Sequence, residues 1–124
     1  MGDEDNRRAA DRHTVYMGAE ITTPEGKVRS AITQDASATG LLLLTRAKIE
    51  IGAKISIRVY VPGEDDKSEV VEGTVVRKHA LDASESSLWR EKVAVHFDTN
   101  LPEWLTGAFV SVSEKQEQLF GKKK

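Results

Sequence analysis

Two groups of polar residues in this chain have the types and spacing that suit an anionic ligand. Arg7, Arg8 and Arg12 lie close to the N-terminus, and the segment Asp35-Ala36-Ser37-Ala38-Thr39-Gly40 follows further along. The paired N–H groups of a guanidinium fit phosphate oxygens and the O6/N7 edge of guanine, and a carboxylate suits the guanine N–H edge. Together the two groups predict a pocket for a guanine nucleotide, with no sign that the nucleotide is chemically changed there.

Each group also has an ordinary structural explanation. Arginines at a polar terminus commonly do no more than lie in solvent. Asp35 and Ser37 followed by Gly40 also fit a plain turn, because short polar side chains hydrogen-bond nearby backbone groups. The presence of both groups in one chain favours ligand binding. For Arg7, stacking on a base and a solvated position are equally open.

Composition restricts the classes of protein to which the chain can belong. A length of 124 residues suits one domain whose core needs no metal or disulfide. The absence of cysteine excludes disulfides, thiolate metal sites and cysteine nucleophiles. Eighteen basic and twenty acidic residues give a formal net charge of −2, which disfavours general nucleic-acid binding. The three histidines match no zinc pattern and Ser37 has no evident base, so we expect neither a metal site nor an enzyme.

The distribution of apolar residues argues against export and membrane insertion. Residues 1–14 are almost wholly polar and lack the apolar region of a signal peptide. The longest apolar run, Leu41 to Leu44, is far shorter than the roughly 20 residues that cross a bilayer. We therefore expect a cytoplasmic protein with a flexible arm over residues 1–14, a folded body over 15–120 and a basic tail over 121–124.

Short alternating segments between turn signals predict a fold made mostly of strands. The expected strands cover residues 15–21, 27–33, 41–45, 54–61, 69–79 and 92–98. From Leu101 the apolar residues recur at three- and four-residue steps, which predicts a helix. Asn100 and Glu103 would cap this helix, residues 110–113 favour a break in it, and Leu119 with Phe120 would dock its last turn. Six strands and a closing helix predict a small six-stranded antiparallel barrel with the helix over one end.

The order and spacing of the two polar motifs resemble those of the PilZ domain family. That family has RxxxR, a gap of some twenty residues, and then [D/N]xSxxG. Here the first motif runs from Arg8 to Arg12 and the second from Asp35 to Gly40, with twenty-two residues between them. Residues 73–77 and 93–97 are similar to later strands of the family, so the resemblance covers about residues 7–120. Ala36 is a mild departure, since a larger aliphatic residue is common there.

The resemblance implies a six-stranded barrel that binds cyclic di-GMP, a bacterial second messenger, and needs no cofactor. By this resemblance Arg8 and Arg12 hold guanine and phosphate, Asp35 and Ser37 bind the opposite guanine edge, and Gly40 permits the turn. We expect a non-enzymatic receptor whose arm becomes ordered around the ligand, at a cost in conformational entropy. The signal would then pass to an unidentified partner protein.

Two other functions stay open. The first is an adaptor barrel that binds only protein, and the arginine motif counts against it. The second is a small barrel that binds nucleic acid, which the net charge and the small number of aromatic residues (two Trp, two Tyr and three Phe) disfavour. A monomer or a homodimer, with one or two ligand molecules per chain, is compatible with the sequence.

Overall fold

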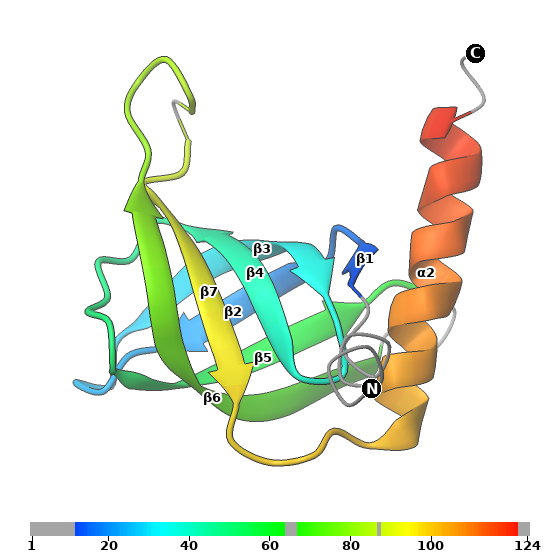
Figure 1. Cartoon of the computed structure of the whole chain (residues 1–124), viewed down its shortest axis with the longest axis horizontal. Helices are drawn as coiled ribbons and strands as arrows, with labels where there is room; N and C mark the ends of the chain where they lie inside the picture. Colours follow the sequence, from blue (N-terminus) through cyan, green and yellow to red (C-terminus); the bar gives the residue numbers. More distant parts are fainter. Residues whose placement is uncertain (1–11, 64–66, 87, 122–124) are drawn as a thin grey trace, which may run out of the picture.

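The computed structural model describes residues 12–63, 67–86 and 88–121 (Figure 1). The predicted arm, with Arg7 and Arg8, lies outside the described residues except for its last three positions, and so do residues 122–124 of the predicted tail. The strands are β1 (His13–Thr14), β2 (Gly18–Thr22), β3 (Val28–Ala36), β4 (Gly40–Thr45), β5 (Lys54–Val61), β6 (Lys67–Ala80) and β7 (Glu91–Phe97), and the helix is α2 (Glu103–Gly121).

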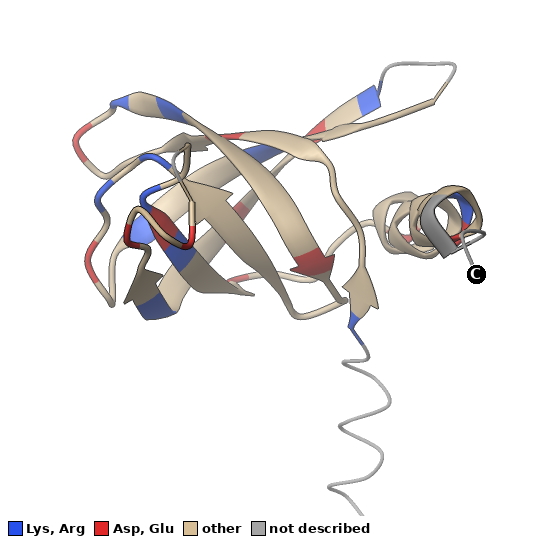
Figure 2. Ribbon diagram, turned by 90° about the horizontal axis from the view of Figure 1, so that it is seen from above, with Lys and Arg blue, Asp and Glu red and all other residues tan. Residues whose placement is uncertain are grey.

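Strands β2 to β7 form a closed antiparallel barrel, which confirms the predicted fold class. The order around the barrel is β3-β2-β5-β6-β7-β4, and β4 pairs again with β3 to close it. The two-residue strand β1 pairs with the C-terminal end of β3. Helix α2 crosses the end of the barrel near β1, and Figure 2 shows it end-on beside the strands. Its apolar face there includes Leu105 and Phe109, which are fully buried.

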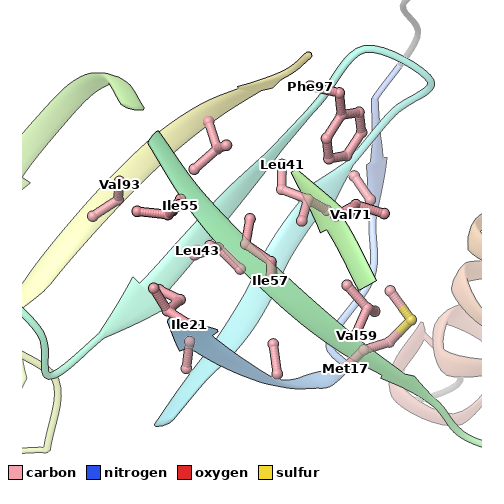
Figure 3. Close-up of a cluster of buried hydrophobic side chains, with 14 of the residues drawn as sticks. Met17, Ile21, Leu41, Leu43, Ile55, Ile57, Val59, Val71, Val93 and Phe97 are labelled. Atoms are coloured by element: carbon pink, nitrogen blue, oxygen red, sulfur yellow. The ribbon is translucent and has the colours of Figure 1, made fainter. Parts of the chain in front are cut away.

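Alternation along the strands fills the barrel with aliphatic side chains. In β5, Ile55, Ile57 and Val59 point inward and are buried, while the residues between them are exposed or half-buried. Figure 3 shows these side chains meeting those of the facing strands, including Leu43 of β4 and Val93 of β7. The barrel interior is therefore a packed core, and any ligand site must lie on its outer surface or at its ends.

The predicted strand over residues 15–21 is only partly confirmed, because β2 begins at Gly18 and residues 15–17 lie between it and the short strand β1. Between β1 and β2 the backbone leaves the regular ladder, and the fully buried hydroxyl of Thr33 takes the place of a strand partner. That hydroxyl accepts a hydrogen bond from the Met17 N–H at 2.9 Å and donates one to the Val15 carbonyl oxygen. The side chain of Thr33 thus satisfies two buried backbone groups at the point where β1 separates from β2.

Helix α2 corrects three expectations from the sequence. It begins at Glu103, where the Pro102 carbonyl accepts from the N–H groups of Leu105 and Thr106, and no hydrogen bond joins Asn100 to Glu103 in this described segment. It continues unbroken through residues 110–113, because burial of its apolar face outweighs weak local propensity.

Leu119 does not dock the last turn of α2 as expected. Leu119 is 72% exposed, and the side chain of Phe120 lies outside the described residues. Within the part of the chain that the structure covers, no helix has both the length and the hydropathy needed to span a membrane.

The substitution Thr33→Val tests the hydroxyl bridge between β1 and β2. Valine keeps the shape but leaves the Met17 N–H and the Val15 carbonyl without a buried partner, so we expect a loss of about 1–3 kcal/mol in the free energy of unfolding. Urea unfolding monitored by circular dichroism measures it. Thr22→Val, a half-buried threonine of β2, is the control and should change stability by no more than about 0.5 kcal/mol. Equal losses in both variants would contradict the bridge.

Candidate functional site

The carboxylate of Asp35 faces outward because β3 contains an extra residue. The register between β3 and β4 shifts between Thr33 and Asp35, which makes Gln34 a β-bulge. Ala31 and Thr33 point into the barrel, so strict alternation would turn residue 35 inward as well. With the bulge, Ala36 takes the buried position and the side chain of Asp35 stays 24% exposed.

Strand β1 brings the end of the first polar motif against the start of the second. Thr14 is the backbone partner of Asp35, and His13 is the partner of Ala36. The Thr14 hydroxyl donates to Asp35 Oδ1 at 3.3 Å. Nη1 of Arg12 lies 3.8 Å from Asp35 Oδ2. Two residues that are 23 positions apart in the sequence therefore form one charged pair on the outer surface.

The pair between Arg12 and Asp35 is weak enough to be exchanged for a ligand. The guanidinium side chain is 60% exposed, and 3.8 Å is too long for a good hydrogen bond. Exposed ion pairs of this kind contribute about 0–1 kcal/mol. Both partners thus keep most of their hydrogen-bonding capacity, since the guanidinium has five donors and the carboxylate has about four acceptor positions.

Ser37 holds the turn between β3 and β4. Its side chain is buried, and its hydroxyl oxygen accepts from the backbone N–H of Thr39 at 3.1 Å and of Gly40 at 3.2 Å. The Ser37 backbone N–H also donates to the Gly40 carbonyl at 3.0 Å. In this structure the hydroxyl is occupied by the turn, so its first effect is to fix the backbone next to Asp35.

Gly40 is required by close strand packing. A Cβ on this residue would lie 2.4 Å from the carbonyl oxygen of Val95 on β7, which is closer than real side chains approach. Its φ angle is not in the left-handed region, whereas Gly26 and Gly52 do have positive φ values. The small size of Gly40, rather than its conformational freedom, lets the turn lie against β7.

An apolar strip lies beside Asp35 on the outer surface. Leu42 pairs with Asp35 on one side and with Ala94 of β7 on the other, and alternation turns both apolar side chains outward. Leu44 and Ile32 continue the strip as the next outward pair. All four side chains are half-buried. Such a surface can support the flat face of an aromatic base whose polar edge reaches the carboxylate.

Helix α2 holds the other side of the segment that carries Arg12. The Gln116 side chain accepts from the Tyr16 N–H and donates to the Tyr16 carbonyl, both at 2.9 Å. The Ser113 hydroxyl donates to the Thr14 carbonyl at 2.7 Å. Gln116 thereby acts as a strand partner made from a side chain. A cleft of about 550 Å³ lies between this part of α2 and residues 12–16.

Comparison with known proteins identifies the family. A family model described as PilZ domain matches residues 6–119, which is nearly the whole chain. The chain belongs to the PilZ domain family. No curated protein sequence matches it.

Solved structures of PilZ domains share the fold of this chain. The PilZ domain of YcgR from Escherichia coli, solved with c-di-GMP, has a TM-score of 0.72 at 13% identity and aligns over 95% of this chain and 99% of that one. The PilZ domain of CeSA from a cellulose-synthesizing bacterium has a TM-score of 0.53 at 14% identity, over 87% and 99% of the two chains. The Bacillus subtilis inhibitor of motility MotI/DgrA has a TM-score of 0.62 at 16% identity, and 95% of this chain covers 53% of it. This PilZ chain thus spans about half of that protein.

The structure adds residues that the sequence pattern did not single out. Thr14 contacts Asp35, Leu42 lies beside it on the outer surface, and Gln116 binds the backbone next to β1. The alternation of residues 41–45 could have indicated that Leu42 faces outward. Nothing local indicates the role of Gln116, because its partner Tyr16 is 100 positions away.

The substitution Ser37→Ala tests whether this hydroxyl holds the turn. Loss of the acceptor leaves the N–H groups of Thr39 and Gly40 without their partner, so we expect their hydrogen exchange to become roughly tenfold faster. Exchange measured by NMR reports both amides directly. Ser30→Ala, at an exposed position of β3, should leave them unchanged. Unaltered exchange in Ser37→Ala would show that the turn does not depend on the hydroxyl.

Proposed function

We propose that this PilZ domain is a non-enzymatic receptor for cyclic di-GMP. The observation that carries the proposal is the Arg12–Asp35 pair at the edge of an outward apolar strip. A cation suits the phosphates of a guanine nucleotide, a carboxylate suits the guanine N–H edge, and an apolar surface suits the face of the base. The solved YcgR PilZ domain with c-di-GMP, which has the same fold, supports this choice of ligand.

Asp35 and Arg12 would divide the recognition of one guanine. The carboxylate of Asp35 can accept from guanine N1–H and N2–H₂ when the Arg12 guanidinium moves away from it. That guanidinium can then donate to a phosphate or to the O6/N7 edge, and its plane can stack on the base. Leu42 would lie under the ring. The exchange costs little, because the pair that it replaces is exposed and long.

Four further residues complete the proposed site. Arg8 would supply a second guanidinium to guanine and phosphate, and Arg7 would stack on a base or lie in solvent. Ser37 and Gly40 would act mainly by fixing the turn beside Asp35, since the hydroxyl is held by the turn and the glycine lies against β7. To contact the ligand as expected, the Ser37 hydroxyl would have to form one hydrogen bond in addition to those within the turn.

The proposed signal passes from β1 to α2. Strand β1 lies between β3 and α2 and is hydrogen-bonded to both, and the adjacent Tyr16 is also bonded to α2. When the arginines of residues 7–12 bind the ligand, they would therefore displace β1. A ligand changes such an arrangement only through its preference for one position of β1. The exposed part of α2 would then present the change to a partner protein.

Calorimetric titration with cyclic di-GMP tests the receptor function. We expect saturable binding, and we expect Arg8→Ala, Arg12→Ala and Asp35→Ala each to weaken it about tenfold or more, because a hydrogen bond to a charged group contributes about 1.5–3 kcal/mol. Circular dichroism should show an unchanged fold in each variant. The stoichiometry of the titration distinguishes one bound ligand from two.

Two matched variants make the titration specific. Arg58→Ala removes an exposed arginine of β5 and should leave the affinity unchanged. Arg12→Lys keeps the charge but removes the planar fork, and it should bind more weakly than the wild type. No saturation at high micromolar ligand would contradict the receptor function and favour an adaptor that binds only protein.

Gln116→Ala tests the path through α2. In the wild type we expect saturating cyclic di-GMP to shift the amide NMR signals of residues 113–117. The variant lacks both hydrogen bonds to Tyr16, so it should still bind while those shifts largely disappear. Gln118→Ala, an exposed glutamine two residues further on, should behave as the wild type. A wild-type α2 that does not respond to bound ligand would refute the path and leave the binding itself intact.

A further inference from the structure

A second cleft opens at the end of the barrel opposite α2. It has a volume of about 770 Å³ and is lined by residues 28–30 at the start of β3, by 46–48 after β4, and by 80–81 and 90–91 around the β6–β7 connection. The turn that contains Ser37 lies at the other end of the β3–β4 hairpin. The cleft is therefore separate from the proposed nucleotide site, and no role is assigned to it so far.

Four cations from three segments of the chain surround this cleft. They are Arg29, Arg46, Lys48 and Arg90, and all four side chains belong to exposed residues. Within residues 12–63, 67–86 and 88–121, none of them forms an ion pair. Figure 2 shows several Lys and Arg segments at the end of the barrel away from α2, with Asp and Glu segments among them. The formal charge of the whole chain is −2, so this concentration of positive charge is local.

The one carboxylate in the lining does not neutralise the four cations. The Glu91 side chain is only 7% exposed, lies 3.9 Å from Lys78 Nζ, and accepts from the Ile49 N–H at 3.5 Å. It is thus held beneath the surface by groups outside the cluster of four. The exposed cations therefore repel one another, and binding of an external anion would reduce this repulsion.

Nearby acidic residues at this end are also engaged elsewhere. Glu50 Oε1 lies 3.8 Å from Lys78 Nζ, and Glu85 Oε2 lies 3.2 Å from His79 Nε2. The Asp82 carboxylate accepts hydrogen bonds from the Ser84 hydroxyl and from the backbone N–H of Glu85. These bonds, with that of Ser84 the largest cause, hold the pKa of Asp82 below its ordinary value. The local carboxylates thus stabilise their own loops and leave the cleft positive.

The lining favours a carboxylate-rich peptide over a nucleic acid. Three of the four cations are arginines, whose planar forks match carboxylates and phosphates. Among the described residues no aromatic side chain lines the cleft, so bases would find no stacking partner there. Aliphatic side chains are present instead, with Val28 54% exposed and Leu81 half-buried. Acidic side chains with an aliphatic residue among them would fit both features.

We propose that this cationic cleft docks a carboxylate-rich segment of a partner protein. The Arg29, Arg46 and Arg90 guanidiniums hold its carboxylates, and Val28 contacts an aliphatic side chain of the same segment. Charge complementarity of this kind accelerates association and makes it dependent on salt. Because the cleft and the Asp35 turn lie at opposite ends of the β3–β4 hairpin, the docked segment leaves the Asp35 end free. Docking does not depend on whether a nucleotide binds.

Titration of the ¹⁵N-labelled chain with the synthetic peptide EELEELEE, followed by NMR at low salt, tests the proposal. We expect saturable amide shifts confined to residues 28–30, 46–48, 80–81 and 90–91, which disappear when salt is added. The glutamine analogue QQLQQLQQ should cause none. Arg46→Ala with Arg90→Ala should weaken binding about tenfold or more, since two close charge pairs are lost. Binding of cyclic di-GMP should be the same in this double variant as in the wild type.

A second double variant separates the cleft from net charge. Lys54→Ala with Lys115→Ala removes the same two positive charges from other exposed positions, and it should bind the acidic peptide as the wild type does. An equal loss in both double variants, shifts outside the cleft, or no binding at all would overturn the proposal. Tighter binding of an unstructured oligothymidylate in the cleft would also overturn it and assign the cleft to nucleic acid.

Discussion

One extra residue in β3 determines where the Asp35 carboxylate can act. Beside Gln34, strand β3 pairs with β4 on one side and with β1 on the other. The backbone of β3 must satisfy both ladders. Because side chains alternate strictly, a strand without the bulge would place a carboxylate inside an aliphatic core, where an unpaired charge is very costly. The bulge removes that conflict and puts Ala36 in the buried position. The outward carboxylate, the Arg12 contact and the apolar strip beside them all follow from it.

The segment of residues 12–17 is held from two sides by different kinds of bond. On the β3 side it has backbone pairing and the buried hydroxyl of Thr33. On the α2 side it is held by the side chains of Ser113 and Gln116, which are only partly covered. Bonds of the second kind are easier to break, because water can replace them at little cost. Residues 12–17 are thus held firmly by β3 and weakly by α2, as expected of a segment that moves when a ligand binds.

The β3–β4 hairpin has different chemistry at its two ends. The end with Asp35 and Ser37 combines a carboxylate, a hydroxyl-fixed turn and outward leucines, and Arg12 lies beside it. The other end opens into a cleft surrounded by arginines and a lysine. The packed barrel between them gives both ends fixed positions, since its interior has no room to deform. A small domain can in this way offer two chemically different surfaces without a second core.

The sequence by itself determined the fold class and the residue types of the candidate site. Alternation in segments such as 54–61 depends only on neighbours along the chain, and so do the two motifs that end at Arg12 and Gly40. Tertiary structure decided what pairing between segments controls: the bulge at Gln34, the non-strand residues 15–17 that Thr33 holds between β1 and β2, and the continuation of α2 through residues 110–113. The gathering of four cations in one cleft was decided in the same way, because their segments meet only when the barrel closes. Local propensity cannot report such features, since each depends on a partner in another segment of the chain.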